Sequence, residues 1–237
     1  MAIIFFLCIV AGFIQRTTGF GFGIFIMTML PLLMPSYGEA TTLSGLLALT
    51  TTLLITLRMR RFIDWRQLMP ILLTFVAVSA VAVCCLSRID DALLHKVLGA
   101  VLVLTALHFA LFSRRVRLAP TRGVQIGAGV LSGLMGGLFA MQGPPAALYF
   151  LAAESDKQRY MATSSAYFLL GNGAMTLVRA GNGFLTAAVG HGYLYGIGGV
   201  VAGTWLGACA FRHIPEKSFR YVVYAYIGLC GLYFCLT

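Results

Sequence analysis

Two short segments rich in glycine and proline interrupt long apolar runs, and they are the first candidates for chemistry. Residues 19–23 read Gly-Phe-Gly-Phe-Gly, and residues 142–145 read Gln-Gly-Pro-Pro. Both residue types break helices, and a broken helix at membrane depth must face protein or a watery cavity. Free amide groups and the positive end of a half-helix at such a break favour an anion. We therefore expect anion contacts from Gly19, Gly21, Gly23, Gln142, Gly143 and Pro144; a simple helix kink is the alternative.

Arg16 lies just before the first break, within the sequence Gln-Arg-Thr-Thr at residues 15–18. If a helix begins near Ile3, Arg16 lies about 20 Å along it, well inside an apolar slab. A charge at that depth is costly and is by default functional, and a guanidinium suits an oxyanion. The alternative is a side chain that extends to the membrane interface. We add Gln15, Arg16 and Thr18 to the substrate-binding candidates.

Hydroxyl and amide side chains complete the set of candidates. Thr42 and Thr163 occupy equivalent places in the two halves of the chain, and a hydroxyl beside a cavity can bind an oxyanion without charge. The alternative is a hydrogen bond to the backbone one turn earlier, which is common in membrane helices. Gln142 and Asn172 are neutral amides within apolar runs, where substrate contact and helix–helix contact are equally good interpretations.

The sequence contains no obvious residues for enzymatic chemistry. There is no Gly-x-x-x-x-Gly-Lys phosphate loop and no His-Glu-x-x-His metal motif. The six cysteines show no metal spacing, and the seven acids fall in loops or at the ends of apolar runs. We expect no catalytic residue, no metal ligand and no cofactor, so a membrane-embedded enzyme is a weak alternative.

The composition excludes a soluble protein. Of the 237 residues, 59% are hydrophobic and 10% are charged, against about 25% charged in an ordinary soluble domain. The net charge of +10 comes from Lys and Arg in short polar breaks, such as residues 58–61 and 114–122. That distribution is typical of cytoplasmic loops of membrane proteins. We expect a multi-pass, all-α integral membrane protein with lipid as a partner and no binding to nucleic acid.

The apolar runs predict the elements that must position the candidate residues. A membrane helix needs about 20 mostly apolar residues. Two regions, 1–34 and 123–153, are too long for one span and contain the two breaks. Six runs fit a single span each: residues 40–57, 68–86, 93–112, 160–178, 193–211 and 219–236.

The two halves of the chain resemble one another. At an offset of 121 residues, Thr42 aligns with Thr163 and Arg58 with Arg179. Each half has a broken, re-entrant-like segment followed by three helices, so we expect a duplication within one membrane domain. The first repeat is residues 1–117 and the second is residues 118–237. If both broken segments cross the membrane fully, the two repeats are parallel. If both are re-entrant hairpins, the repeats are inverted and more of the basic residues lie on the cytoplasmic side. The positive-inside rule favours the inverted arrangement.

These motifs resemble a known family. Ala-Gly-Phe-Ile-Gln at residues 11–15, followed by Thr-Gly-Phe-Gly-Phe-Gly at 18–23, resembles the opening motif of the sulfite exporter TauE/SafE permeases. Ser-Gly-Leu-Met-Gly-Gly at 132–137, with Gly143 and Pro144, resembles the second copy of that motif. The resemblance covers nearly the whole chain. It implies a permease for a small sulfur-containing or organic anion such as sulfite, thiosulfate or sulfoacetate.

Together these features predict a secondary transporter of the bacterial inner membrane. The anion would bind near the midplane between the two broken segments. Two alternative functions remain. One is a channel-like facilitator, and the other is a membrane protein that assists the assembly of a partner without transport. A homodimer is also left open by the sequence.

Overall fold

The computed structural model describes residues 2–18, 20–86, 88–112, 121–154, 156–210 and 228–236, and within these ranges it is helical with no strand. The all-α prediction is therefore confirmed. Residues 228–236 are also helical. The other elements, in chain order, are α1 Ala2–Thr18, α2 Phe22–Ile26, α3 Leu30–Leu33, α4 Tyr37–Met59, the 3-10 helix η1 Arg60–Phe62, α5 Trp65–Leu86, α6 Asp91–Phe112, α7 Arg122–Phe139, α8 Gly143–Ala153, α9 Lys157–Gly181 and α10 Ala187–Ala210.

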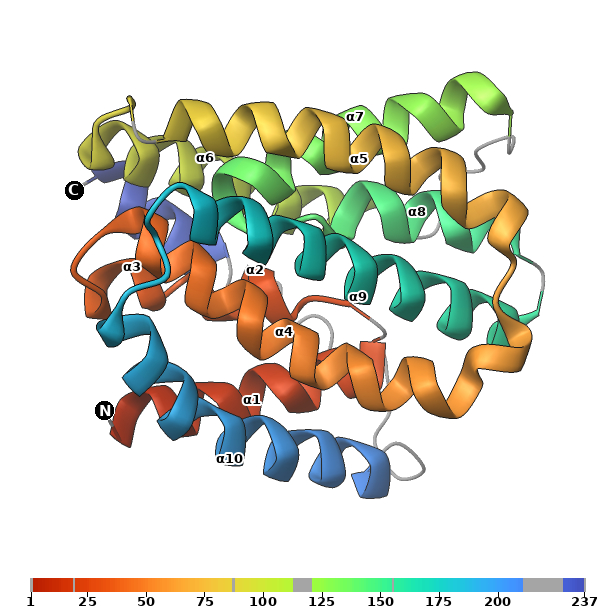
Figure 1. Cartoon of the computed structure of the whole chain (residues 1–237), viewed down its shortest axis with the longest axis horizontal. Helices are drawn as coiled ribbons and strands as arrows, with labels where there is room; N and C mark the ends of the chain where they lie inside the picture. Colours follow the sequence, from red (N-terminus) through yellow and green to blue (C-terminus); the bar gives the residue numbers. More distant parts are fainter. Residues whose placement is uncertain are drawn as a thin grey trace.

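Helices α4 and α9 pack against each other through the middle of the bundle, and they run in opposite directions (Figure 1). At one end, Glu39 near the start of α4 accepts a hydrogen bond of 2.5 Å from the Thr186 hydroxyl, just after α9. At the other end, the Asp64 amide donates to Thr163 Oγ1 near the start of α9, at 3.1 Å. The start of each helix therefore lies beside the end of the other.

Glycines bring two further helix pairs into close contact at opposite edges of the bundle (Figure 1). On α7, Gly129 and Gly133 pack against Ile71 and Phe75 of α5. On α10, Gly199, Gly203 and Gly207 pack against Phe5, Ile9 and Phe13 of α1. Small residues at every fourth position let the two backbones of each pair approach closely. Because the contacts advance along both chains together, α1 runs parallel to α10, and α5 runs parallel to α7.

The direction of α1 explains the role of the break that follows it. Helix α10 runs parallel to α4, since Gly192 packs on Leu43 and Gly196 on Leu47. Helices α1 and α4 therefore run the same way, and the chain between them must return. Helices α2 and α3 make this return, and α8 makes the corresponding return between α7 and α9. Each broken segment is a helical hairpin.

The first return differs from the second in a way that the sequence does not predict. Helix α8 is continuous over 11 residues, whereas the first return is split into α2 and α3 by a turn at residues 27–29. Pro31 lies in the first turn of α3. Because proline has no N–H group, it cannot continue the hydrogen-bond ladder of α2. The Thr28 hydroxyl donates to the Phe25 carbonyl at 2.6 Å and closes the turn.

The outer surface carries many large apolar side chains. Leu177, Leu194 and Trp205 are 76%, 70% and 66% exposed. In the described part of the chain, the segments Tyr37–Phe62 and Trp65–Leu86 are long and apolar enough to cross a membrane, judged by length and composition alone.

Candidate functional site

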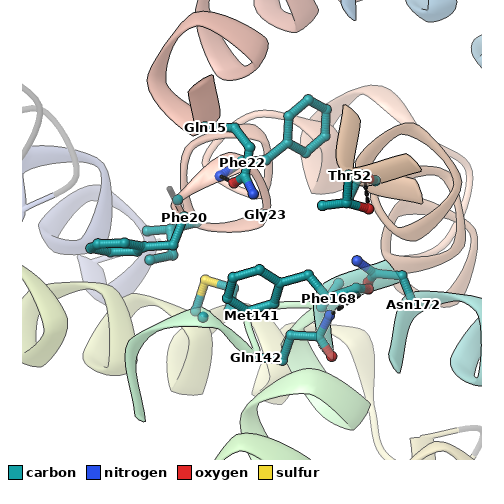
Figure 2. Close-up of a pocket in the computed structure, with 14 residues that line it drawn as sticks. Gln15, Phe20, Phe22, Gly23, Thr52, Met141, Gln142, Phe168 and Asn172 are labelled. Carbon is teal, nitrogen blue, oxygen red and sulfur yellow. Dashed lines mark hydrogen bonds between the residues drawn. The ribbon is translucent and has the colours of Figure 1, made fainter. Parts of the chain in front are cut away.

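A small pocket lies where the tips of the two hairpins meet. Its volume of about 30 Å³ is room for two or three water-sized spheres at about 10–15 Å³ each. Figure 2 shows side chains from the first hairpin and α4 along one side, and from the second hairpin and α9 along the other. The lining residues are Gln15, Phe20, Gly21, Phe22, Gly23, Ile24, Ala48, Thr52, Ala140, Met141, Gln142, Gly143, Phe168 and Asn172.

Gln15 shapes the tip of the first hairpin. Its side chain is 4% exposed, and Oε1 accepts a 3.0 Å hydrogen bond from the amide of Phe22, the first residue of α2. Gly21 precedes α2 with φ of 103°, a left-handed conformation that glycine adopts without strain. Gln15 therefore satisfies an amide that the short helix leaves without a partner. A glutamine near the end of α1 thereby sets where α2 begins.

The two hairpin tips touch at Gly23. A Cβ atom at this position would overlap with the carbonyl oxygen of Ala140. Ala140 ends α7 in a left-handed conformation, with φ of 54°, and its amide donates to the Gly136 carbonyl at 3.1 Å. Only glycine lets the two backbones approach this closely.

Gln142 is a buried polar group of the pocket whose hydrogen-bonding capacity is only partly used. It is 5% exposed, its Nε2 donates to the Phe168 carbonyl over a long 3.5 Å, and its Oε1 has no partner among the described residues. A buried polar atom without a partner is unfavourable by about 1–3 kcal/mol. Asn172 lines the same pocket and is 7% exposed. Two buried amides therefore line this pocket.

The electrostatic character of the pocket suits an anion of low charge. No Asp or Glu is among the lining residues. Helix α8 begins at Gly143 in the pocket wall, and the positive end of its dipole points there. Thr52 offers the pocket a hydrogen-bond acceptor rather than a donor, because its hydroxyl already donates to the Ala48 carbonyl at 2.9 Å. Across the described ranges, no three His, Cys, Asp or Glu residues are grouped to hold a metal ion.

The structure brings only some of the expected site residues together. Pro144 lies in the wall of a neighbouring apolar pocket. Gly19 lies outside the described residues, and so does the side chain of Thr18. The candidates that line the central pocket are Gln15, Gly21, Gly23, Gln142, Gly143 and Asn172.

The two expected threonines make structural hydrogen bonds away from this pocket. The Thr42 hydroxyl donates to the Gly38 carbonyl one turn earlier, at 2.7 Å. Thr163 accepts from the Asp64 amide and fixes the connection before α5. Thr52 and Phe168 line the pocket instead. Phe168 also offers a backbone carbonyl, for which side-chain type gives no signal.

Two arginines have surroundings that the sequence did not specify. Arg16 lines a separate pocket with Arg58 rather than the central one. Arg179, in the last turns of α9, is 1% exposed. Its guanidinium donates to the carbonyls of Gly136 at 2.8 Å, Gly137 at 3.1 Å and Thr41 at 3.2 Å. The only signal for Arg179 in the sequence was its alignment with Arg58.

Comparison with known proteins confirms the resemblance that the sequence motifs indicate. Residues 4–234 match the family model described as sulfite exporter TauE/SafE. No curated protein and no solved structure gives a significant match.

Proposed function

Because the chain belongs to the sulfite exporter TauE/SafE family, we propose that it carries a small sulfur-containing or organic anion across the bacterial inner membrane. Proteins of this family are membrane transporters rather than enzymes. The observation that carries the proposal is the meeting of two hairpin tips at one pocket lined by amides and free of carboxylates. The chain is then a multi-pass protein with lipid around it.

The pocket favours a compact oxyanion. The Gln142 and Asn172 amides can donate hydrogen bonds to anion oxygens, and the start of α8 supplies positive potential without a full charge. The small volume of about 30 Å³ favours the compact sulfite or thiosulfate over the longer sulfoacetate. Binding of an oxyanion would replace the long Gln142–Phe168 hydrogen bond with a shorter one to a charged acceptor.

The opposite directions of the two hairpins support inverted repeats and alternating access. Helices α1 and α4 run one way, and α7 and α9 run the other way. Motion of one repeat against the other would expose the central pocket to each side of the membrane in turn. With no lining carboxylate to carry a proton, the membrane potential would drive the anion outward, by about 2.3 kcal/mol per charge per 100 mV.

Uptake by proteoliposomes tests this function. The purified chain is reconstituted and given radiolabelled sulfite, thiosulfate or sulfoacetate, with and without an imposed potential. We expect saturable, potential-dependent flux of a compact oxyanion. Gln142→Leu removes an amide from the pocket and should lower that flux at least roughly tenfold, the effect of losing one hydrogen bond to a charged group.

Gln158→Leu is the matched control, because Gln158 is exposed at the start of α9. It should transport like the unchanged chain. Equal saturable flux in the Gln142→Leu and Gln158→Leu variants would remove the central pocket from the pathway. Flux that never saturates would favour the channel-like facilitator. No flux from a folded preparation would favour the assembly protein.

A further inference from the structure

A second pocket lies beside the central one, between α1, α4 and α10. Its volume is about 400 Å³, and its polar groups are Arg16 from α1, Arg58 from α4 and Thr204 from α10. The two pockets are neighbours. Gln15 lines the first and Arg16 the second, and on α4 Thr52 lines the first while Ile55, about one helical turn further on, lines the second.

The second pocket concentrates positive charge that nothing in the described structure neutralises. Arg16 is half-buried, and Arg58 is close enough for the two charges to repel each other. Neither guanidinium forms an ion pair with a carboxylate in the described ranges. The Thr204 hydroxyl is buried and lacks a hydrogen-bond partner there. Two unpaired guanidinium groups and a free hydroxyl form a donor set that an oxyanion would complete.

The equivalent place in the second half of the chain is closed. The offset of 121 residues pairs Arg58 with Arg179 and Arg16 with Gly137. Because Gly137 has no side chain, the Arg179 guanidinium reaches the backbone and donates to the Gly136 and Gly137 carbonyls. In the first half the Arg16 side chain stands at the corresponding position, and Arg58 stays exposed. Both charges of this pocket therefore come from the first half of the chain, and the second half has no counterpart to them.

We propose that Arg16, Arg58 and Thr204 form a receiving site for a small oxyanion, on the side of the membrane where α4 ends. The role in transport rests on the proposed function, whereas the binding chemistry does not. A positive pocket about one helical turn from the central pocket would raise the local anion concentration on that side only. The phosphate of an anionic lipid has the same chemistry, and the exposed Trp205 places part of this pocket at the outer surface.

Trp205 provides a direct readout of binding. The chain has two tryptophans, Trp65 and Trp205, and Trp205 lines the pocket. The full chain carrying Trp65→Phe, purified with neutral lipid, is titrated with sodium sulfite at constant ionic strength while Trp205 emission is recorded. We expect a saturable change in emission, with the apparent affinity weakened roughly tenfold by either Arg16→Gln or Arg58→Gln.

Arg60→Gln is the matched control, since Arg60 is exposed on η1 and outside the pocket. It should titrate like the parent. No emission change with sulfite, in protein that elutes as a folded species, would overturn the proposal. A response to phosphatidylglycerol and none to sulfite would also overturn it, by making the occupant a lipid headgroup.

The central-pocket variant separates this proposal from the transport function. Gln142→Leu should lose transport and keep the Trp205 titration unchanged. A chain that transports none of the three anions, yet still shows the arginine-dependent titration, would refute the proposed function and leave the binding site standing. If Gln142→Leu instead lost both transport and the Trp205 emission change, the two pockets would act as one site. That result would overturn the proposal of a separate receiving site.

Discussion

At the scale of single residues, Arg179 joins three helices close to the tip of the second hairpin. Its guanidinium donates to carbonyl groups of α7 and α4. The two α7 carbonyls belong to the last turn of that helix, where the helix supplies fewer partners for them. Arg179 therefore fixes the end of α7, directly before the pocket residue Ala140, against α4.

Replacing Arg179 should destabilise the fold. Arg179→Met puts an unbranched apolar side chain in its place and removes the guanidinium donors from the carbonyls of Gly136, Gly137 and Thr41. We expect a loss of about 1.5–3 kcal/mol in the free energy of unfolding, the range for hydrogen bonds to a charged group. The measurement is unfolding in detergent followed by circular dichroism. Arg60→Met, at an exposed site, should change stability by no more than about 0.5 kcal/mol. Equal stability of the two variants would contradict this structural role.

The sequence could identify the amides of the pocket but not its hydroxyls. Gln15, Gln142 and Asn172 stand out because amides are rare within apolar runs, and all three line the pocket. Threonine gives no such signal, because its hydroxyl can bond to the carbonyl one turn earlier in any helix. Thr42 and Thr52 both do so, yet only Thr52 lines the pocket. The difference lies in which face of α4 each occupies, and that depends on packing.

At the scale of elements, glycine spacing could be predicted as a packing signal, but the partner helix could not. The glycines of α10 repeat every four residues and so lie on one face. The sequence does not say that this face packs on α1, nearly two hundred positions away. The sequence does not predict the second break within the first hairpin, for a similar reason. Residues 1–34, with Pro31 among them, form one interrupted apolar segment.

Gly203 tests the contact between α1 and α10. A Cβ atom at Gly203 would overlap with the backbone of Ile9, and backbone cannot rotate away as a side chain can. We expect Gly203→Ala to separate the helices and lower the free energy of unfolding by about 1–3 kcal/mol. The measurement is a denaturant titration of the purified protein in detergent.

Gly190 provides the control on the same helix. A Cβ atom there meets nothing within 4 Å, and alanine is the better helix former, by up to about 1 kcal/mol. Gly190→Ala should therefore be neutral or slightly stabilising. If both alanine variants were equally stable, α1 and α10 would not pack at this distance.

At the scale of the whole molecule, helix direction bears on the two arrangements that the sequence left open. Parallel repeats require α4 and α9 to run the same way, and inverted repeats require opposite directions. Hydrogen bonds at both ends of this pair join the start of one helix to the region at the end of the other. The distribution of basic residues gives only a preference for the inverted repeats, because the positive-inside rule is a statistical tendency. The packing of α4 on α9 adds a geometric argument for opposite directions, which amino-acid composition cannot provide.

Cysteine labelling in cells tests this arrangement on the full chain. In a cysteine-free background, single cysteines replace Arg61 on η1, Gln158 at the start of α9 or Asn182 at its end, all exposed positions. A membrane-impermeant maleimide should label Asn182→Cys in intact cells, and the other two variants only after permeabilisation, because η1 lies against α9 near its start. Labelling of Gln158→Cys but not Arg61→Cys in intact cells would place the two ends on opposite sides, as parallel repeats require. The inverted repeats would then fail, and with them the alternating exposure of a pocket shared by two opposed hairpins.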